Sequence, residues 1–235
     1  MITVGLPVYN QTEILPLALL GLTNQQNAGE WELIISSEDD VWDIVKKYED
    51  KLRSTGCKWV IRDRLKDWIP LPHKWKRIGE YMSKDSVGMM LQAADCYAHP
   101  DRIAQSRRAM EGGYDWYQES RGYFYDFKTD LLVLYDGNIK TGSRTDLNMC
   151  IAARHAKRLP VSDKRKGIDN WMLRTIDNPR MYVFENIPCG VDLVGVNNIS
   201  IKRPGKMRKL DKPWKRTDKK ITDVLSNWNE IKIFL

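Results

Sequence analysis

An apolar run ends at a single carboxylate in the segment Met90-Leu91-Gln92-Ala93-Ala94-Asp95-Cys96-Tyr97-Ala98-His99-Pro100-Asp101-Arg102-Ile103. Residues 87–91 are short and apolar enough to form a fully buried strand. In open α/β sheets ligands bind outside the carboxyl ends of the strands, which is where Asp95 would emerge. The local pattern also allows a plainer interpretation, in which Asp95 lies in an ordinary turn and caps a helix at 100–112.

Strand-like and helix-like segments alternate ahead of this segment. Buried strands are expected at 2–6, 31–37 and 58–62, and helices at 13–23 and 41–54, where apolar residues recur at helical spacing. Strands that alternate with helices favour a mainly parallel sheet with right-handed crossovers.

Composition limits the class of protein. A hydrophobic content of 42% in 235 residues is typical of one globular domain, and no apolar run approaches the length of a membrane span. No secretory signal is visible, so we expect a cytoplasmic protein, in the host cytoplasm if the source is viral. The four cysteines lack a Cys-x-x-Cys spacing, which predicts reduced thiols. A net charge of +7 predicts an anionic partner, for which nucleotide, nucleic acid and membrane surface all qualify.

The segment around Asp95 resembles nucleotide-sugar glycosyltransferases of the GT-A fold, especially the large inverting family two. Members often read Asp-Ala-Asp-Asp-Tyr-Ser-His-Pro-Asp-Arg-Leu here. Asp95 and the His99-Pro100-Asp101-Arg102 tail match, whereas Ala93 and Cys96 replace two acids. The resemblance implies an α/β fold of GT-A (Rossmann-like) type, with a mixed, mainly parallel sheet flanked by helices. The lysine and arginine content of the C-terminal segment adds a basic extension to this fold. We expect a domain at 1–200, divided into a nucleotide-sugar half (1–104) and an acceptor half (105–200), followed by the extension at 201–235.

The resemblance also nominates a donor site. The family's Pro-x-Tyr-Asn opening is matched at 7–10, and its second loop, whose acid accepts a hydrogen bond from the donor base, is matched at 32–40. A helix beginning after Pro72 would place Lys74 and Arg77 on one face, at positions i and i+3, within reach of a diphosphate. The expected donor-binding residues are Pro7, Tyr9, Asn10, Glu38, Asp39, Lys74, Arg77, Gln92 and Asp95. The residues also allow plainer interpretations. Pro7 and Asn10 can form a strand-ending turn, and the acidic cluster at 38–40 can simply cap a helix. Lys74 and Arg77 can lie on a solvated basic face.

A second chemical candidate lies in Lys166-Gly167-Ile168-Asp169-Asn170-Trp171-Met172-Leu173. This segment resembles the family's Glu-Asp-x-x-Leu, with Ile168 in place of the Glu. The resemblance implies that Asp169 is the base that takes the acceptor's proton, and it places Trp171 on the acceptor side. The alternative is that Asp169 only caps a helix.

The family's cofactor is a divalent cation, Mg²⁺ or Mn²⁺, that bridges the two phosphates. Asp95 is the only retained acid of the metal-binding set. Either one carboxylate, phosphates and water hold the metal, or Lys74, Lys76 and Arg77 replace part of its charge.

Residues 202–220 are rich in lysine and arginine and include one tryptophan. Such a segment can bind a phosphate backbone and stack an exposed base, lie on anionic lipid, or form a solvated tail. The acceptor-binding residues expected here are Lys206, Arg208, Lys209, Trp214, Lys215 and Arg216.

These observations together predict a transferase that moves a sugar from a nucleoside diphosphate sugar, such as a UDP-sugar, to an acceptor hydroxyl. The expected acceptor is a hydroxymethylated pyrimidine in DNA, as in a phage DNA-modifying enzyme. A glycan or lipid-linked acceptor is one alternative. The other is an inactive module that binds a nucleotide sugar or nucleic acid.

Overall fold

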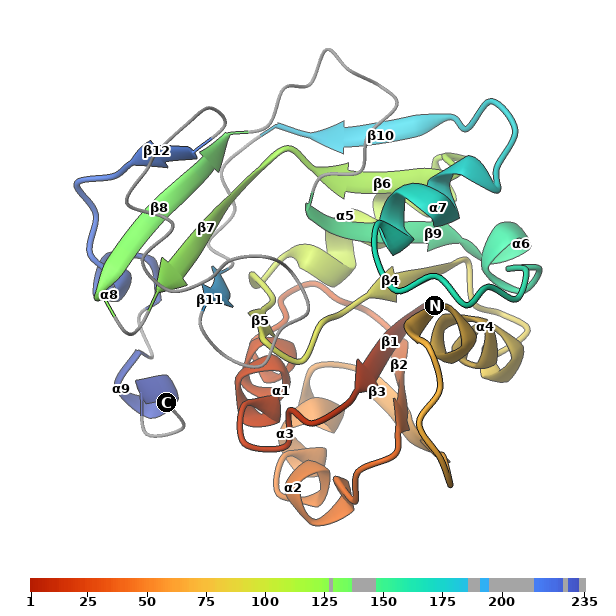
Figure 1. The fold of residues 1–235 in the computed structure, drawn as a ribbon, viewed down its shortest axis with the longest axis horizontal. Coiled ribbons are helices and arrows are strands. Elements are labelled where there is room, and N and C mark those ends of the chain that lie inside the picture. Colours follow the sequence, from red (N-terminus) through yellow and green to blue (C-terminus); the bar gives the residue numbers. More distant parts are fainter. Residues whose placement is uncertain (127–128, 137–146, 186–190, 195–213, 226–227, 233–235) are drawn as a thin grey trace.

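The computed structural model describes residues 1–126, 129–136, 147–185, 191–194, 214–225 and 228–232 (Figure 1). The strands in this part of the chain are β1 (Ile2–Val8), β2 (Trp31–Ser37), β3 (Cys57–Arg64), β4 (Gly88–Leu91), β5 (Cys96–Tyr97), β6 (Trp116–Glu119), β7 (Arg121–Asp126), β8 (Leu131–Asp136), β9 (Leu147–Ala152), β10 (Met181–Phe184), β11 (Val191–Val194) and β12 (Trp214–Arg216). The helices are α1 (Leu15–Thr23), α2 (Trp42–Lys46), α3 (Glu49–Ser54), α4 (Leu71–Tyr81), α5 (Arg102–Glu111), α6 (Ala153–Ala156), α7 (Ile168–Arg174), α8 (Ile221–Val224) and α9 (Trp228–Lys232).

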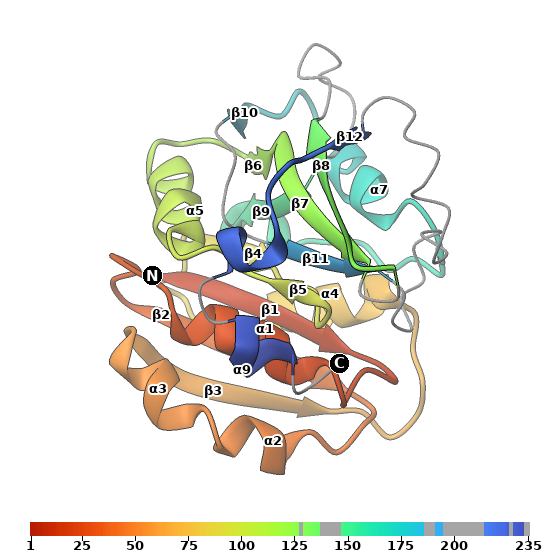
Figure 2. The ribbon, with the colours of Figure 1, turned by 90° about the vertical axis from the view of Figure 1, so that its left-hand side faces the viewer.

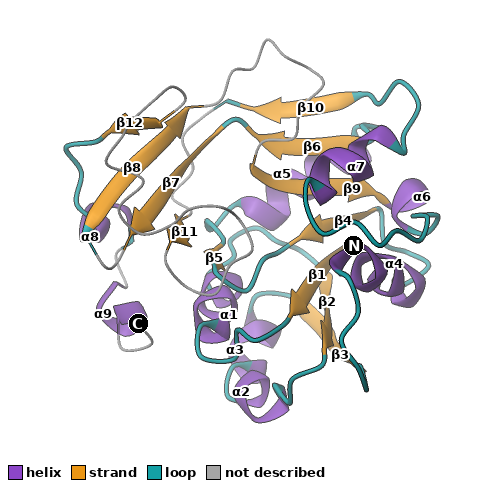
Figure 3. Ribbon diagram, in the orientation of Figure 1, coloured by secondary structure: helices purple, strands orange, loops and turns teal. Residues whose placement is uncertain are grey.

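The larger sheet has the strand order β10-β6-β9-β4-β1-β2-β3. Neighbouring strands run parallel in the pairs β1–β2, β2–β3, β1–β4 and β6–β10, and only β9 runs against its two neighbours within this described sheet. The carboxyl ends of β1, β2, β3, β4, β6 and β10 therefore meet at one edge, which we call the carboxyl edge. The mainly parallel sheet flanked by helices is confirmed (Figure 3).

Both faces of this sheet are covered, which explains why nearly all residues of β1 and β2 are buried. One face packs against side chains of α1, α2, α3 and α5, and the other packs against α4, α6 and α7. Gly5 allows α4 to approach β1 closely, because a Cβ at this position would lie 2.8 Å from Cζ3 of Trp75.

A second sheet, of order β12-β8-β7-β11-β5, begins directly after β4 with β5 (Figure 2). From the segment expected to be a basic extension, β12 pairs antiparallel with β8, and Ile221, Val224 and Trp228 pack in a core cluster with residues of α1 and β7. Residues 201–213 of that segment lie outside the described residues. In the described part of the chain no helix has the length and apolarity needed to cross a membrane.

Candidate functional site

The loop after β1 is joined to the loop after β2 at the carboxyl edge. Pro7 is the partly buried penultimate residue of β1, and Tyr9, just beyond the strand, keeps 47% of its surface exposed. Asn10 has a positive φ of 51°, and its backbone N–H donates to Oδ2 of Asp39 at 2.7 Å. Asp39 therefore holds the first loop in place through one carboxylate oxygen.

Lys74 fastens the same two loops from the first turns of α4. Its ammonium is buried, donates to the carbonyl of Val8 at 2.7 Å and forms an ion pair with Glu38. Burial lowers the pKa of Lys74, and the pairing with Glu38 opposes that shift. Nζ also lies 5.4 Å from the ring centre of Tyr9, and the second oxygen of Glu38 accepts from the backbone N–H of Ile69 at 3.1 Å. Both charges are thus engaged in linking three loops.

Arg77, the second expected phosphate ligand, lies one turn further along α4. It forms a two-bonded ion pair with Asp63, in which Nε donates to Oδ2 at 2.7 Å. Asp63 is buried near the end of β3 and also accepts from the hydroxyl of Ser36 at 2.8 Å. The Arg77 guanidinium therefore ties α4 to β2 and β3.

Asp95 lies in the turn that follows β4, and its side chain is partly exposed. Gln92 is fully buried beneath this turn: its Nε2 donates to the carbonyls of Ala93 and Cys96 at 2.8 and 2.7 Å. Its Oε1 accepts from Nη1 of Arg102 at 2.7 Å, a guanidinium that is itself buried. Gln92 and Arg102 thus set the shape of the turn that presents Asp95.

Glu119, at the carboxyl end of β6, is a buried carboxylate that the sequence analysis missed. It accepts from the hydroxyl of Tyr117 at 2.9 Å and from Nδ2 of Asn148 at 2.6 Å, and Nε2 of His99 lies 2.6 Å from its Oε1. His99 follows the Asp95 turn, so the network fixes that turn to β6 and β9. Residues 116–118 read Trp-Tyr-Gln, so no apolar run like the one at 87–91 marks the position of Glu119 in the sequence.

Asp169 occupies the first turn of α7, where the alternative was a helix cap. The N-cap is instead Gly167, whose φ of 61° suits glycine, and no side chain caps this helix. Asp169 forms no hydrogen bond or ion pair with any residue that the structure describes. Burial raises its pKa above that of an ordinary aspartate. Trp171, two residues on, is half-buried against the core of this face.

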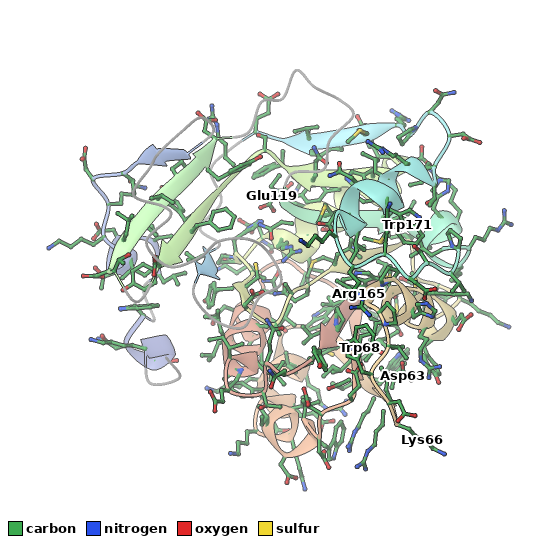
Figure 4. The ribbon with its side chains drawn as sticks, viewed as in Figure 1. Asp63, Lys66, Trp68, Glu119, Arg165 and Trp171 are labelled. Atoms are coloured by element: carbon green, nitrogen blue, oxygen red, sulfur yellow. The ribbon has the colours of Figure 1, made fainter. Side chains whose placement is uncertain are left out.

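The segment leading to α7 contacts the loop after β3. Nε2 of His73 lies 2.9 Å from Oδ1 of Asp163, and the guanidinium carbon of Arg165 lies 5.2 Å from the ring centre of Trp68. Trp68 in turn packs edge-on against Tyr9, with ring centres 6.2 Å apart. Figure 4 shows Arg165 beside Trp68, with Trp171 beyond it. These contacts place the start of α7 near the carboxyl edge.

The described residues contain no group of three or more His, Cys, Asp or Glu side chains that could hold a metal. At the Asp95 turn, Ala93 offers no ligand, and the thiol of Cys96 is buried and lies 3.6 Å from Oδ1 of Asn148. Hard cations prefer carboxylate and phosphate oxygens. Of the side chains at positions 93, 95 and 96, only the Asp95 carboxylate is of the kind that such a cation prefers.

The acceptor-binding residues expected in the basic segment divide into two groups. Lys206, Arg208 and Lys209 lie outside the described residues. Trp214, Lys215 and Arg216 form β12, whose backbone pairs with β8 at Tyr135, Leu134 and Val133.

No protein-family model and no curated protein matches the sequence. Solved structures do match. S. aureus TarS 1–349 in complex with UDP has a TM-score of 0.62 and 13% identity over 83% of this chain and 61% of that one. The same protein in complex with UDP-GlcNAc has a TM-score of 0.56 and 12% identity over 82% and 58%. The mannosyltransferase PcManGT from Pyrobaculum calidifontis, in complex with GDP-Man and Mn²⁺, has a TM-score of 0.57 and 12% identity over 85% and 58%.

The chain thus spans about three fifths of the length of these matched chains. Identities this low show the fold alone, and the predicted GT-A fold is confirmed.

Proposed function

We propose that this chain is a glycosyltransferase that moves a sugar from a nucleoside diphosphate sugar to an acceptor hydroxyl, with Asp169 as the base. The observation that carries the proposal is the state of the Asp169 carboxylate. It has no polar partner among the described residues, it does not cap its helix, and burial raises its pKa. A structural carboxylate is normally paired, whereas a general base needs a free oxygen and raised basicity.

In the reaction, the acceptor hydroxyl gives its proton to Asp169 while its oxygen forms a bond to the anomeric carbon. The bond from that carbon to the diphosphate oxygen breaks, and its electron pair stays on the diphosphate, which gains one negative charge. A divalent cation held by Asp95 and the phosphates would neutralise part of that charge.

In this proposal the donor binds at the loops of the carboxyl edge that Lys74 and Arg77 hold together. Tyr9 offers an exposed ring for the nucleobase, and Asp39, fixed against the backbone of Asn10, has a carboxylate oxygen for the base N–H. The solved complexes of TarS with UDP and of PcManGT with GDP-Man support a nucleotide-sugar donor on this fold. In this proposal, Lys74 and Arg77 position the donor loops through their ion pairs with Glu38 and Asp63.

The acceptor is proposed from the charge of the C-terminal segment. A hydroxymethylated pyrimidine in DNA is favoured by the basic segment 202–220, and a glycan or lipid-linked acceptor is the alternative. Binding to duplex and single-stranded DNA across a salt series distinguishes them, because each phosphate neutralised lowers log affinity by about 0.7 to 0.9 per log unit of salt. An enzyme directed to a neutral glycan shows no such slope.

Donor hydrolysis tests the function without knowledge of the acceptor. Incubation with UDP-GlcNAc, GDP-Man and other nucleotide sugars should release nucleoside diphosphate slowly, because a transferase passes its sugar to water when the acceptor is missing. If the protein binds a nucleotide sugar but releases no nucleoside diphosphate, with or without an acceptor, it is an inactive binding module. If the protein binds none of the nucleotide sugars, the proposal is contradicted.

A further inference from the structure

The segment 161–167 brings an arginine to the donor side of the carboxyl edge. It starts beyond α6 and ends at Gly167, and Asp163 attaches it to the start of α4 by lying 2.9 Å from Nε2 of His73. Two residues later, the guanidinium carbon of Arg165 lies 5.2 Å from the ring centre of Trp68 (Figure 4). Arg165 is therefore next to the loop after β3 and four residues before Asp169.

Unlike Lys74 and Arg77, Arg165 has no acidic partner among the residues that the structure describes. Lys74 is paired with Glu38 and Arg77 with Asp63, and both cations hold loops together. The Arg165 side chain is exposed and, among the described residues, contacts only the Trp68 ring through a polar interaction. An exposed cation–π contact is weak, so a stronger ligand can draw the guanidinium away.

A diphosphate is such a ligand, and the proposed reaction needs a cation beside the departing diphosphate. The departing diphosphate gains one negative charge, yet the turn after β4 supplies one carboxylate, Asp95, for a metal, with Ala93 where the resemblance expects a second. A guanidinium donates two parallel N–H bonds to phosphate oxygens and keeps its charge at any relevant pH.

We propose that Arg165 leaves the face of Trp68 when the donor binds and donates hydrogen bonds to its diphosphate. This role rests on the proposed function and adds a catalytic residue to it. Arg165 transfers no proton: it stabilises the charge that the diphosphate acquires as the bond to the anomeric carbon breaks. One short segment then supplies both the cation for the leaving group and, through Asp169, the base for the acceptor.

The flanking lysines provide matched controls, because Lys164 and Lys166 are exposed, carry the same charge and lie in the same segment. The variants are Arg165→Met, Lys164→Met and Lys166→Met, with thermal unfolding to check that each is folded. Titration calorimetry measures the affinity for UDP, GDP and uridine, and donor hydrolysis measures turnover.

Arg165→Met should weaken diphosphate binding by about 10- to 100-fold, the usual effect of losing charged hydrogen bonds. Uridine binding should not change, and each lysine variant should stay within about threefold of the wild type because exposed charges contribute little. Turnover should fall further than affinity, since the diphosphate charge grows in the transition state.

Three results would overturn the assignment. If Arg165→Met binds UDP or GDP as tightly as a wild type that does bind it, Arg165 is not a phosphate ligand, and the proposed function stands without it. If the variant loses uridine and diphosphate affinity equally, Arg165 acts on the base or on the loop. If the wild type binds no nucleoside diphosphate, whichever its base, the proposed function fails, and the role of Arg165 fails with it.

Discussion

The carboxylates on the two sides of the carboxyl edge differ in whether they are paired with a cation. On the donor side, Glu38 and Asp63 come from the ends of β2 and β3, and each is paired with a cation of α4. On the acceptor side, Asp169 has no polar partner within the described residues, and burial raises its pKa. Paired charges fix the shape of a site, whereas an unpaired, desolvated carboxylate is available for proton transfer. The type of residue is therefore less informative than its partner.

Removing the basicity of Asp169 should produce the largest effect and tests the acceptor side of this comparison. Asp169→Asn keeps the shape of the side chain but cannot accept the proton, so sugar transfer should fall by about 10²- to 10⁴-fold. Unfolding stability should change little, because Asp169 has no described partner to lose. Transfer rate and thermal unfolding are measured together, with Asp177→Asn, an exposed acid just beyond α7, as the control. Equal losses of stability and activity would indicate a structural role.

Breaking an ion pair of α4 tests the donor side, and two lysines of this helix form a matched pair. Lys74→Met leaves Glu38 nearly buried without its cation, which should cost about 3 to 5 kcal/mol in unfolding free energy. Lys76→Met removes an exposed pair with Glu80 and should cost about 0 to 1 kcal/mol. Denaturant unfolding measures both.

The double variant Glu38→Gln with Lys74→Met should recover part of the loss, because no buried charge is then left unpaired. If Lys74→Met and Lys76→Met are equally stable, Lys74 does not brace the donor loops.

The pH dependence should be the smallest effect, and its sign follows from the raised pKa of Asp169. Between the ordinary value of 3.8 and the folded pKa, the folded protein keeps a proton that the unfolded chain has released. Stability contributed by this group therefore falls as pH rises through that window, and Asp169→Asn should lack the fall. Transfer should rise with pH over the same window, because only the ionised carboxylate accepts a proton. Identical profiles for wild type and variant would contradict the raised pKa.

Much of the fold followed from local pattern. The strand at 31–37 and the place of Asp95 after a buried strand were predicted correctly, because apolar runs and the residues that end them are visible in a short window. The pairing of Lys74 with Glu38, 36 positions apart, was not, since periodicity does not report on contacts between distant segments.

The same limit applies to the candidate site. Trp68, Arg165 and Glu119 were not singled out, because their roles depend on which loops the fold brings together. The sequence also left open whether Asp169 caps its helix. That question depends on the backbone at Gly167, where a positive φ makes glycine itself the N-cap.

A crystal structure of the protein with a bound nucleoside diphosphate, UDP or GDP, tests the central claim most directly. We expect the nucleobase beside Tyr9 and Asp39, and a phosphate or its cation within direct or one-water reach of Asp95. A nucleotide bound elsewhere, with Asp95 packed against a helix end, would contradict both the donor site and the proposed transfer reaction.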